Sequence, residues 1–149
     1  MMKDFVKSVK GFDFPSFFKT PISEAELDKY AIRFVELRDN LFTGGIVLKE
    51  YIELKKYQST TNEYRVFYLQ GSILTISKNS NQPDNTPPLP EELAYKYIGL
   101  SSHYYTVDFG ELDSGEFIIL ETGDGQVSGL SPNQHIFKYY DEIRYILSK

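Results

Sequence analysis

The sequence predicts an α+β fold in which a mostly antiparallel sheet is flanked by helices. Apolar residues recur at helical spacing near both ends of the chain, whereas the middle consists of alternating segments separated by short turns. The 12 tyrosines and 11 phenylalanines also favour β-rich structure. A chain of 149 residues forms one domain, or at most two small lobes, and is long enough to bury a core.

The N-terminal third is expected to contain one helix between two short strands. Phe5-Val6 has the composition of a strand and is flanked by lysines. Ser23 and Glu26 form a capping box, which predicts a helix over about residues 24–37. A second strand is predicted to begin at Ile46 and to continue through Ile52.

A hairpin, a loop and a helix should follow. Residues 64–69 and 72–76 alternate as strands do, and Gln70-Gly71 between them fits a two-residue turn. Residues 79–90 are polar and rich in proline, which predicts a surface loop. Pro90 then opens a second helix, with acidic residues close to its positive end.

A second hairpin is predicted to carry Asp108 on one strand and Glu121 on the other, with Asp113-Ser114 as its loop. In that register Asp108 faces Ile119. Glu121 then lies diagonally from Asp108 on the same face, roughly 7–8 Å away at the backbone. A last helix is expected from about Pro132 to the C-terminus.

Composition excludes several classes of function. The chain has no cysteine, which rules out disulfide scaffolds, thiolate zinc sites and cysteine nucleophiles. A net charge of −5 gives no support to nucleic acid as a partner. Ser128 lacks the first glycine of a nucleophile elbow, so a serine hydrolase is not favoured. No apolar run approaches a membrane span and no signal peptide is apparent, which leads us to expect a cytoplasmic protein.

Three carboxylates near the second hairpin point to a metal site. Asp108, Glu121 and Asp124 offer only oxygen ligands, as hard cations prefer, and Mg²⁺ usually takes one or two carboxylates together with substrate phosphates. The alternative is structural. Asp124-Gly125 can form an Asx-type turn, with Glu121 solvated.

A basic cluster lies at the N-terminus. Lys3, Lys7 and Ser8, with Lys10 nearby, could hold a polyphosphate through point charges and a hydroxyl. The required glycines of a Walker-type loop are absent. A solvated, frayed terminus would have the same composition.

Two further segments carry candidate residues. In Glu50-Tyr51-Ile52-Glu53, backbone groups could read a nucleotide base, with a carboxylate near the ribose; alternatively the segment is a strand with solvent-facing charges. Glu63 and Arg65 alternate onto one face. Arg65 fits either a cross-strand ion pair or a phosphate ligand.

The order of these segments resembles the ATP-grasp fold. More narrowly, the chain is similar to a bacterial and phage branch of ATP-grasp proteins that carry the motifs Lys-Asp-x-x-Lys-Ser, here residues 3–8, and Glu-x-Gly-Asp-Gly-Gln-Val-Ser-Gly-Leu, here residues 121–130. In that family two α+β lobes grip ATP. The resemblance implies that about residues 1–50 are a remnant of the smaller lobe, and about residues 51–149 the larger lobe with the metal site.

The resemblance also implies residue roles and a reaction. The chain would be an ATP- and Mg²⁺-dependent carboxylate–amine ligase that forms an acylphosphate from a peptide or small-molecule carboxylate, without nucleic acid or membrane. The implied roles are phosphate contacts by Lys3, Lys7 and Ser8, adenine and ribose contacts by Glu50, Tyr51, Ile52 and Glu53, stabilisation of the transferred phosphoryl group by Arg65, and magnesium binding by Asp108, Glu121 and Asp124.

The chain departs from the family pattern in two ways. The usual metal motif is Glu-x-Asn, and Gly123 stands in the place of the asparagine. The domain that normally precedes Lys3 and helps to bind the carboxylate is expected to be missing, which suggests a fragment, a short relative, or a subunit that needs a partner or a second copy. The alternative function is therefore a non-catalytic nucleotide-binding or protein-interaction module derived from an ATP-grasp enzyme.

Overall fold

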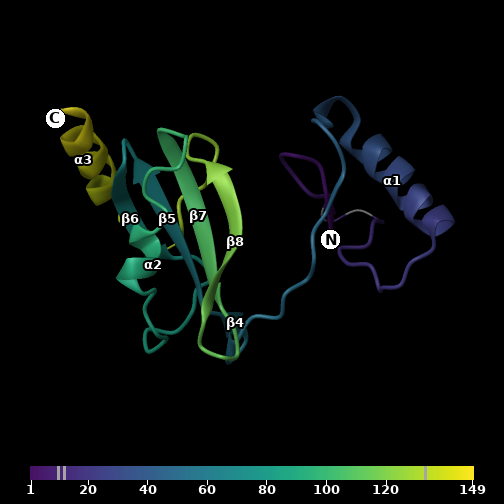
Figure 1. The fold of residues 1–149 in the computed structure, drawn as a ribbon, viewed down its shortest axis with the longest axis horizontal. Helices are drawn as coiled ribbons and strands as arrows, with labels where there is room; N and C mark the ends of the chain where they lie inside the picture. The colour runs from purple at the N-terminus through teal and green to yellow at the C-terminus, as the bar shows by residue number, and fades with distance from the viewer. Residues whose placement is uncertain (10, 12, 133) are drawn as a thin grey trace. The chain divides into compact units, whose positions relative to one another are not determined.

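A computed structural model describes residues 1–9, 11, 13–132 and 134–149 of the chain. The chain divides into two compact units, Met1–Ile52 and Glu53–Lys149, which are described separately below. Both units contain helices and antiparallel strand pairs, which agrees with the predicted α+β class (Figure 1). Among the described residues, none of the helices has the length and apolarity needed to cross a membrane.

The first unit combines a two-stranded sheet with one long helix. Strands β1 (Met2–Lys3) and β2 (Val47–Leu48) pair antiparallel. Helix α1 (Glu24–Arg38) continues into a 3₁₀ turn, η1 (Asp39–Leu41). The Ser23 hydroxyl caps α1 by accepting a hydrogen bond from the Glu26 N–H at 3.3 Å, which confirms the capping-box prediction.

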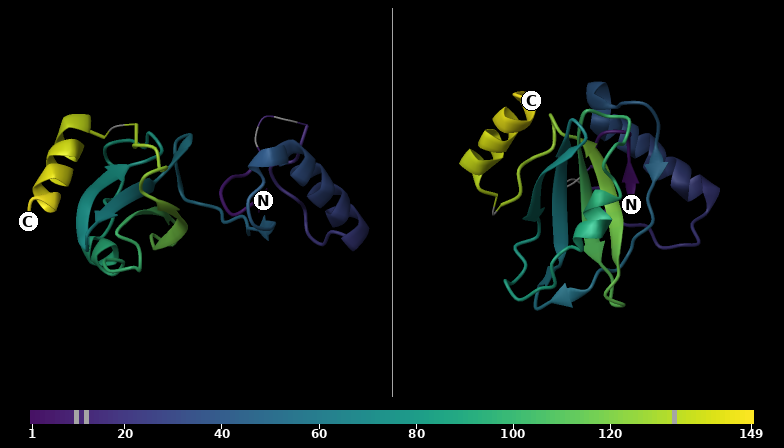
Figure 2. Two further views of the ribbon diagram at one scale, coloured as in Figure 1. Left: turned by 90° about the horizontal axis from the view of Figure 1, so that it is seen from above. Right: turned by 60° about the vertical axis from the view of Figure 1, so that its left-hand side comes forward.

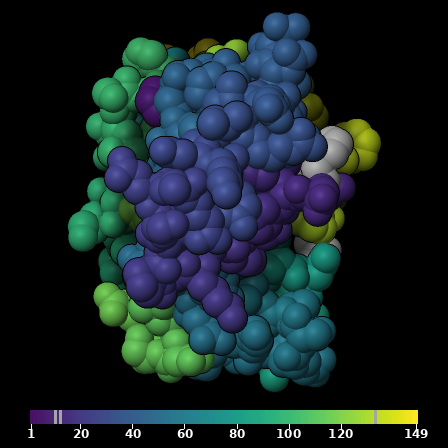
Figure 3. Space-filling view, turned by 90° about the vertical axis from the view of Figure 1, so that its right-hand side faces the viewer, coloured from purple at the N-terminus to yellow at the C-terminus, as the bar shows by residue number. Residues whose placement is uncertain are grey.

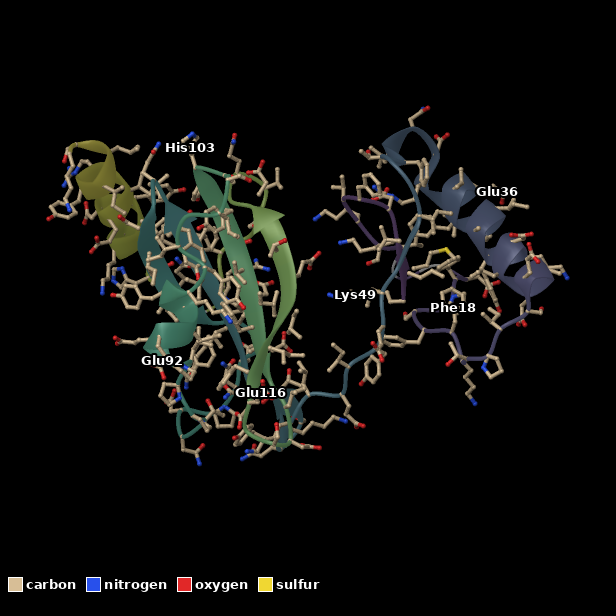
Figure 4. All side chains as sticks on the ribbon, viewed as in Figure 1. Phe18, Glu36, Lys49, Glu92, His103 and Glu116 are labelled. Atoms are coloured by element: carbon tan, nitrogen blue, oxygen red, sulfur yellow. The ribbon has the colours of Figure 1, made fainter. Side chains whose placement is uncertain are left out.

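The core of the first unit lies between α1 and the N-terminal segment. Phe34, fully buried on α1, packs with Met2, Val9 and Phe14. Phe18, labelled in Figure 4, contacts this cluster from the same segment. In the space-filling view the N-terminal segment (purple) and α1 (blue) form one continuous surface (Figure 3).

Two strand predictions in the first unit need correction. Phe5-Val6 is not a strand, because the chain turns back there and the strand is Met2–Lys3. The strand predicted over residues 46–52 is only two residues long, Val47–Leu48, since β1 offers no longer partner. Lys10 of the basic cluster lies outside the described residues.

The second unit is built on a four-stranded antiparallel sheet in the order β6-β5-β7-β8. A short hairpin, β3 (Lys56–Tyr57) with β4 (Thr60–Thr61), precedes it. The sheet strands are β5 (Glu63–Leu69), β6 (Ser72–Lys78), β7 (Tyr104–Glu111) and β8 (Phe117–Asp124). The predicted Gln70-Gly71 turn joins β5 to β6, and both of its residues have positive φ, of 49° and 72°.

Helices cover the two faces of this sheet unequally (Figure 2). Helix α2 (Glu91–Tyr95) packs on the face that carries Val66 and Val107. Helix α3 (Ile136–Leu147) packs on the opposite face, where Tyr139 contacts Phe67. Because α3 covers only one end of its face, the polar residues farther along β5 and β7 are not buried beneath it. Helix α3 begins four residues later than Pro132, with His135 as its N-cap.

The β7–β8 hairpin has a different register from the predicted one. Leu112 bonds to Glu116 across a three-residue loop, and Gly115 in that loop has a φ of 85°. Glu116, labelled in Figure 4, marks this turn. A bulge between the pairs of Asp108 and Phe109 adds Leu120 to β8. Asp108 therefore lies directly opposite Glu121 rather than diagonal to it.

The predicted surface loop over residues 79–90 is partly buried. Gln82 is 4% exposed, and its side-chain amide donates to Asn62 and to the Glu63 carbonyl. The Tyr64 hydroxyl donates to the Pro87 carbonyl at 3.1 Å. The polar composition that suggested a surface loop instead supplies the hydrogen bonds that attach the loop to β5.

Candidate functional site

Arg65, Asp108 and Glu121 lie together on one face of the sheet. Arg65 is directly opposite Asp108 across β5 and β7, and Asp108 is directly opposite Glu121 across β7 and β8. Directly opposed residues of antiparallel strands project to the same side. The structure thus brings these predicted site residues into one row across the sheet.

Arg65 binds Asp108 through two hydrogen bonds. Nε donates to Oδ1 at 2.8 Å, and Nη2 donates to Oδ2 at 2.6 Å. The hydrogen bonds from Asp108 raise the pKa of Arg65 above its usual value; desolvation opposes this effect, and the charge of Glu121 adds to it. The guanidinium is therefore a fixed positive charge beside two carboxylates.

The residues Asp108 and Glu121 fit a hard cation that arrives with a nucleotide. They supply carboxylate oxygens from opposed positions, and Mg²⁺ commonly completes its shell with water and phosphate oxygens. Within residues 1–9, 11, 13–132 and 134–149, no group of three or more acidic or histidine side chains is arranged to hold a metal.

Asp124 is not on this face, contrary to the prediction of a three-carboxylate set. It pairs with Tyr105, whose side chain belongs to the core on the α2 side. Side chains alternate along a strand, so Glu121 and Asp124, three residues apart, project to opposite faces. The Asp124 Oδ1 accepts a hydrogen bond from the Gln126 N–H at 2.8 Å, which is the Asx turn weighed as the alternative.

The segment after β8 reaches Arg65 from another side. The Gly129 carbonyl accepts a hydrogen bond from Arg65 Nη1 at 2.7 Å. Ser128 Oγ donates to the Asp124 carbonyl at 2.8 Å and lies 2.9 Å from Thr106 Oγ1. Sequence reasoning missed these contacts, because a backbone carbonyl ligand leaves no signature in residue type.

In the first unit, Lys3, Lys7 and Ser8 belong to one tight turn. Lys3 and Ser8 form an antiparallel bridge, and the Asp4 N–H donates to the Lys7 carbonyl at 3.0 Å. Lys7 is exposed and Ser8 is half-buried. The turn gathers two ammonium groups and a hydroxyl within six residues, a set that can contact an anion.

Asp4 organises this turn, a role that the sequence analysis did not assign. Its Oδ1 accepts hydrogen bonds from the Val6 and Lys7 N–H groups at 2.8 and 2.6 Å. Its Oδ2 accepts from Arg38 Nε at 2.7 Å and from the Thr43 N–H at 3.4 Å. Burial opposes ionisation of Asp4, yet these hydrogen bonds lower its pKa to about 2. The available signal was the spacing, since an aspartate that bonds N–H groups two and three residues ahead is typical of an Asx turn.

The segment predicted to read a base follows β2. Glu50, Tyr51 and Ile52 are all exposed. The Tyr51 ring meets Phe17 edge-on, with centroids 4.8 Å apart. A cavity of about 420 Å³ lies here, within the first unit, and its lining includes Phe17, Phe18, Ile22, Leu48, Glu50 and Tyr51. Its size and mostly apolar walls suit a planar heterocycle.

The predicted site residues are therefore divided between the units. The first unit contains Lys3, Lys7, Ser8, Glu50, Tyr51 and Ile52. The second unit contains Glu53, Arg65, Asp108, Glu121 and Asp124. Glu53 is exposed at the start of the second unit. Each half of the site is described within its own unit.

Comparison with known proteins identifies the family. Searches of curated proteins and of solved structures found no match. A family model described as an ATP-grasp domain, family 3 of its clade, matches residues 2–143, which is nearly the whole chain. The match supports ATP binding and a ligase-like function. The chain belongs to this family of ATP-grasp domains.

Proposed function

We propose that the chain is an ATP- and Mg²⁺-dependent ligase-like domain that activates a carboxylate, from a peptide or a small molecule, and joins it to an amine or a similar nucleophile. The observation that carries the proposal is the row formed by Arg65, Asp108 and Glu121. It sets one fixed cation beside two carboxylates, and phosphoryl transfer depends on such positioning and charge neutralisation more than on a titrating base.

Each residue of the row has a distinct role in the proposal. Asp108 and Glu121 hold magnesium, which when bound neutralises charge on the phosphates. Arg65 directs its guanidinium at the transferred phosphoryl group. Asp108 also holds Arg65 in place, since both of its oxygens accept from the guanidinium. Asp124 has no ligand role here, because it shapes the following turn.

The first unit provides the nucleotide contacts. Lys3, Lys7 and Ser8 bind phosphate oxygens from the turn that Asp4 organises. The cavity beside Glu50 and Tyr51 receives the adenine. Ile52 and Glu53 follow directly and contact the base and the ribose.

The proposed reaction has two steps. A carboxylate oxygen of the substrate attacks the γ-phosphorus of ATP, the bond to the β-phosphate oxygen breaks, and ADP leaves. The amine nitrogen then attacks the acyl carbon, inorganic phosphate leaves with the bonding electrons, and the nitrogen loses a proton to solvent. In the first step Arg65 counters the negative charge on the transferred group.

Calorimetric titration with a non-hydrolysable ATP analogue and Mg²⁺ tests the binding half of the proposal. We expect wild type to bind and Glu121→Gln to bind at least about tenfold more weakly, since one charged ligand is lost. Glu116→Gln is the matched control, because Glu116 is exposed in the turn of the same hairpin. Equal affinities for wild type and Glu121→Gln would show that Glu121 is not a magnesium ligand.

ADP release in the presence of carboxylate and amine panels tests the catalytic half. Turnover that needs both substrates and is lost in Arg65→Lys supports the ligase. The lysine keeps the charge but not the planar fork that pairs with Asp108. Nucleotide binding with no ADP release for any pair would favour a non-catalytic module derived from the same fold.

A further inference from the structure

We propose that Ser128 is a positioning residue, which fastens the segment after β8 so that the Gly129 carbonyl holds the Arg65 guanidinium in its working orientation. The inference deepens the proposed function, because it assumes that Arg65 acts on the phosphoryl group. It rests on a continuous series of contacts from β7, through the hydroxyl of Ser128, to the far side of the guanidinium.

The first link is a directed chain of hydrogen bonds. Ser128 Oγ donates its single hydrogen to the Asp124 carbonyl at 2.8 Å. The contact between Ser128 Oγ and Thr106 Oγ1, at 2.9 Å, must then be donated by Thr106, because a serine hydroxyl has one hydrogen. The Ser128 N–H also donates to the Asp124 carbonyl, at 3.0 Å. Ser128 is thereby tied to β7 on one side and to the end of β8 on the other.

The second link is the glycine beneath this hydroxyl pair. A Cβ added to Gly123 would lie 2.9 Å from Ser128 Oγ and 3.0 Å from Thr106 Oγ1, which is closer than side chains normally approach. Gly123 lies directly opposite Thr106 across the ladder. The pair can close only over a glycine, which gives a physical reason for glycine at this position.

The third link is Arg65 itself. Its Nε and Nη2 donate to Asp108, and its Nη1 donates to the Gly129 carbonyl at 2.7 Å. Asp108 fixes one edge of the planar guanidinium and Gly129 fixes another. An arginine side chain otherwise loses about 2 kcal/mol of rotamer entropy when it is ordered, so a second anchor made before substrate binds favours the oriented state.

Ser128→Ala breaks the series at its centre. The Asp124 carbonyl loses a donor, the Thr106 hydroxyl loses its acceptor, and the Gly129 carbonyl is no longer held beside Nη1. Asp108 still pairs with Arg65, so the side chain stays in the site but moves more. Loss of one hydrogen bond of ordinary strength corresponds to a roughly fivefold change in an opening equilibrium.

The experiment measures hydrogen exchange at the Nε–H of Arg65 by arginine side-chain NMR, with the signal assigned by its loss in Arg65→Lys. We expect exchange to be roughly fivefold faster in Ser128→Ala than in wild type. Thr106→Val, which removes the donor without removing bulk, should shift the same signal in the same direction. Ser114→Ala is the control, because Ser114 is exposed in the β7–β8 turn and accepts only a local bond from the Glu116 N–H.

Unchanged Arg65 exchange in Ser128→Ala and Thr106→Val would overturn the proposal, and exchange that also rises in Ser114→Ala would do the same. If Ser128→Ala fails to fold, Thr106→Val decides alone. The readout needs no ligand, so it separates this inference from the proposed function. If the ligase assignment holds as well, Ser128→Ala should lower kcat several-fold with little change in the KM for ATP.

Discussion

Arg65 and Asp108 form a cross-strand ion pair with two parallel hydrogen bonds of 2.8 and 2.6 Å, and both side chains are largely shielded from solvent. The pair joins β5 to β7 at the centre of the sheet, where strand pairing alone does not determine which side chains meet. It therefore contributes to folding as well as to the proposed chemistry.

The first prediction concerns the coupling between these two residues. Asp108→Asn should lower the free energy of unfolding by about 2–3 kcal/mol, because it leaves a partly buried guanidinium without its counter-ion. Arg65→Gln should have a similar effect, and the double variant should be less destabilised than the sum of the two. Urea unfolding followed by circular dichroism gives all four free energies, and strictly additive effects would contradict the pairing.

The second prediction concerns the ionisation of Asp4. Its pKa is lowered to about 2 from an ordinary 3.8, so the stabilisation is fully present above the unfolded-state value and is lost as the pH falls through about 2. We expect the amide signals of Val6 and Lys7, which bond to Asp4, to titrate with a midpoint near 2 in NMR spectra.

Asp4→Asn supplies the control for that titration. It should abolish the low-pH transition of these two amides and weaken the turn at neutral pH, because Arg38 loses its anionic partner. A midpoint near the ordinary value in wild type would contradict the assignment of Asp4 as the buried centre of the turn.

The hairpins show how much of the second unit could be predicted. Alternation placed Glu63 and Arg65 on one face of a strand, and Gln70-Gly71 marked the turn correctly. Sequence also placed Asp108 and Glu121 on one face, although the Leu120 bulge makes them directly opposed rather than diagonal. A bulge depends on how β8 packs against its neighbours, and nothing in the local pattern specifies it.

Other site features required coordinates. Asp124 was predicted to bind metal from its closeness in sequence to Glu121, but strand alternation places it on the other face. Asp4 was treated as a spacer between lysines, although it is fully buried and bonds four partners. In both cases a carboxylate can serve a ligand or a backbone turn equally well, and only the positions of the nearby N–H groups decide between them.

The third prediction concerns Glu111, a buried carboxylate outside the proposed site. It is 1% exposed and accepts hydrogen bonds from Lys55 Nζ at 2.9 Å, Asn62 Nδ2 at 2.7 Å and the Tyr57 hydroxyl at 3.0 Å. Burial opposes its ionisation, but these donors, Lys55 first, keep the pKa of Glu111 below its ordinary value. Glu111→Gln should lower the free energy of unfolding by about 3 kcal/mol or more at pH 7, because it leaves Lys55 unpaired and sets an amide against donors.

That difference should depend on pH. A lowered carboxyl pKa gives stability that is present above the unfolded-state value of about 4.5 and declines below it, so wild type and Glu111→Gln should converge in acid. Urea unfolding at several pH values measures this, with the exposed Glu116→Gln as the control that changes stability by less than about 0.5 kcal/mol. A gap that persists unchanged in acid would mean that shape, rather than charge, accounts for the effect.

The fourth prediction separates two costs at one glycine of the first unit. Gly44 has a φ of 75°, and a Cβ there would lie 2.1 Å from Phe5 Cδ2. Gly11 has nearly the same φ, 78°, but a Cβ there would meet nothing within 4 Å. Gly11→Ala should therefore destabilise by about 1 kcal/mol for the backbone alone, whereas Gly44→Ala should destabilise by clearly more.

Phe5→Ala tests whether the excess is steric. Phe5 is 66% exposed, so its own truncation should have a small effect, and it removes the ring that Gly44→Ala would strike. In the Phe5→Ala background the effect of Gly44→Ala should fall to that of Gly11→Ala, as measured by thermal unfolding of the four variants and wild type. An unchanged excess would show that the Phe5 ring does not lie over Gly44 in solution, and that the turn over residues 3–8 is held by Asp4 alone.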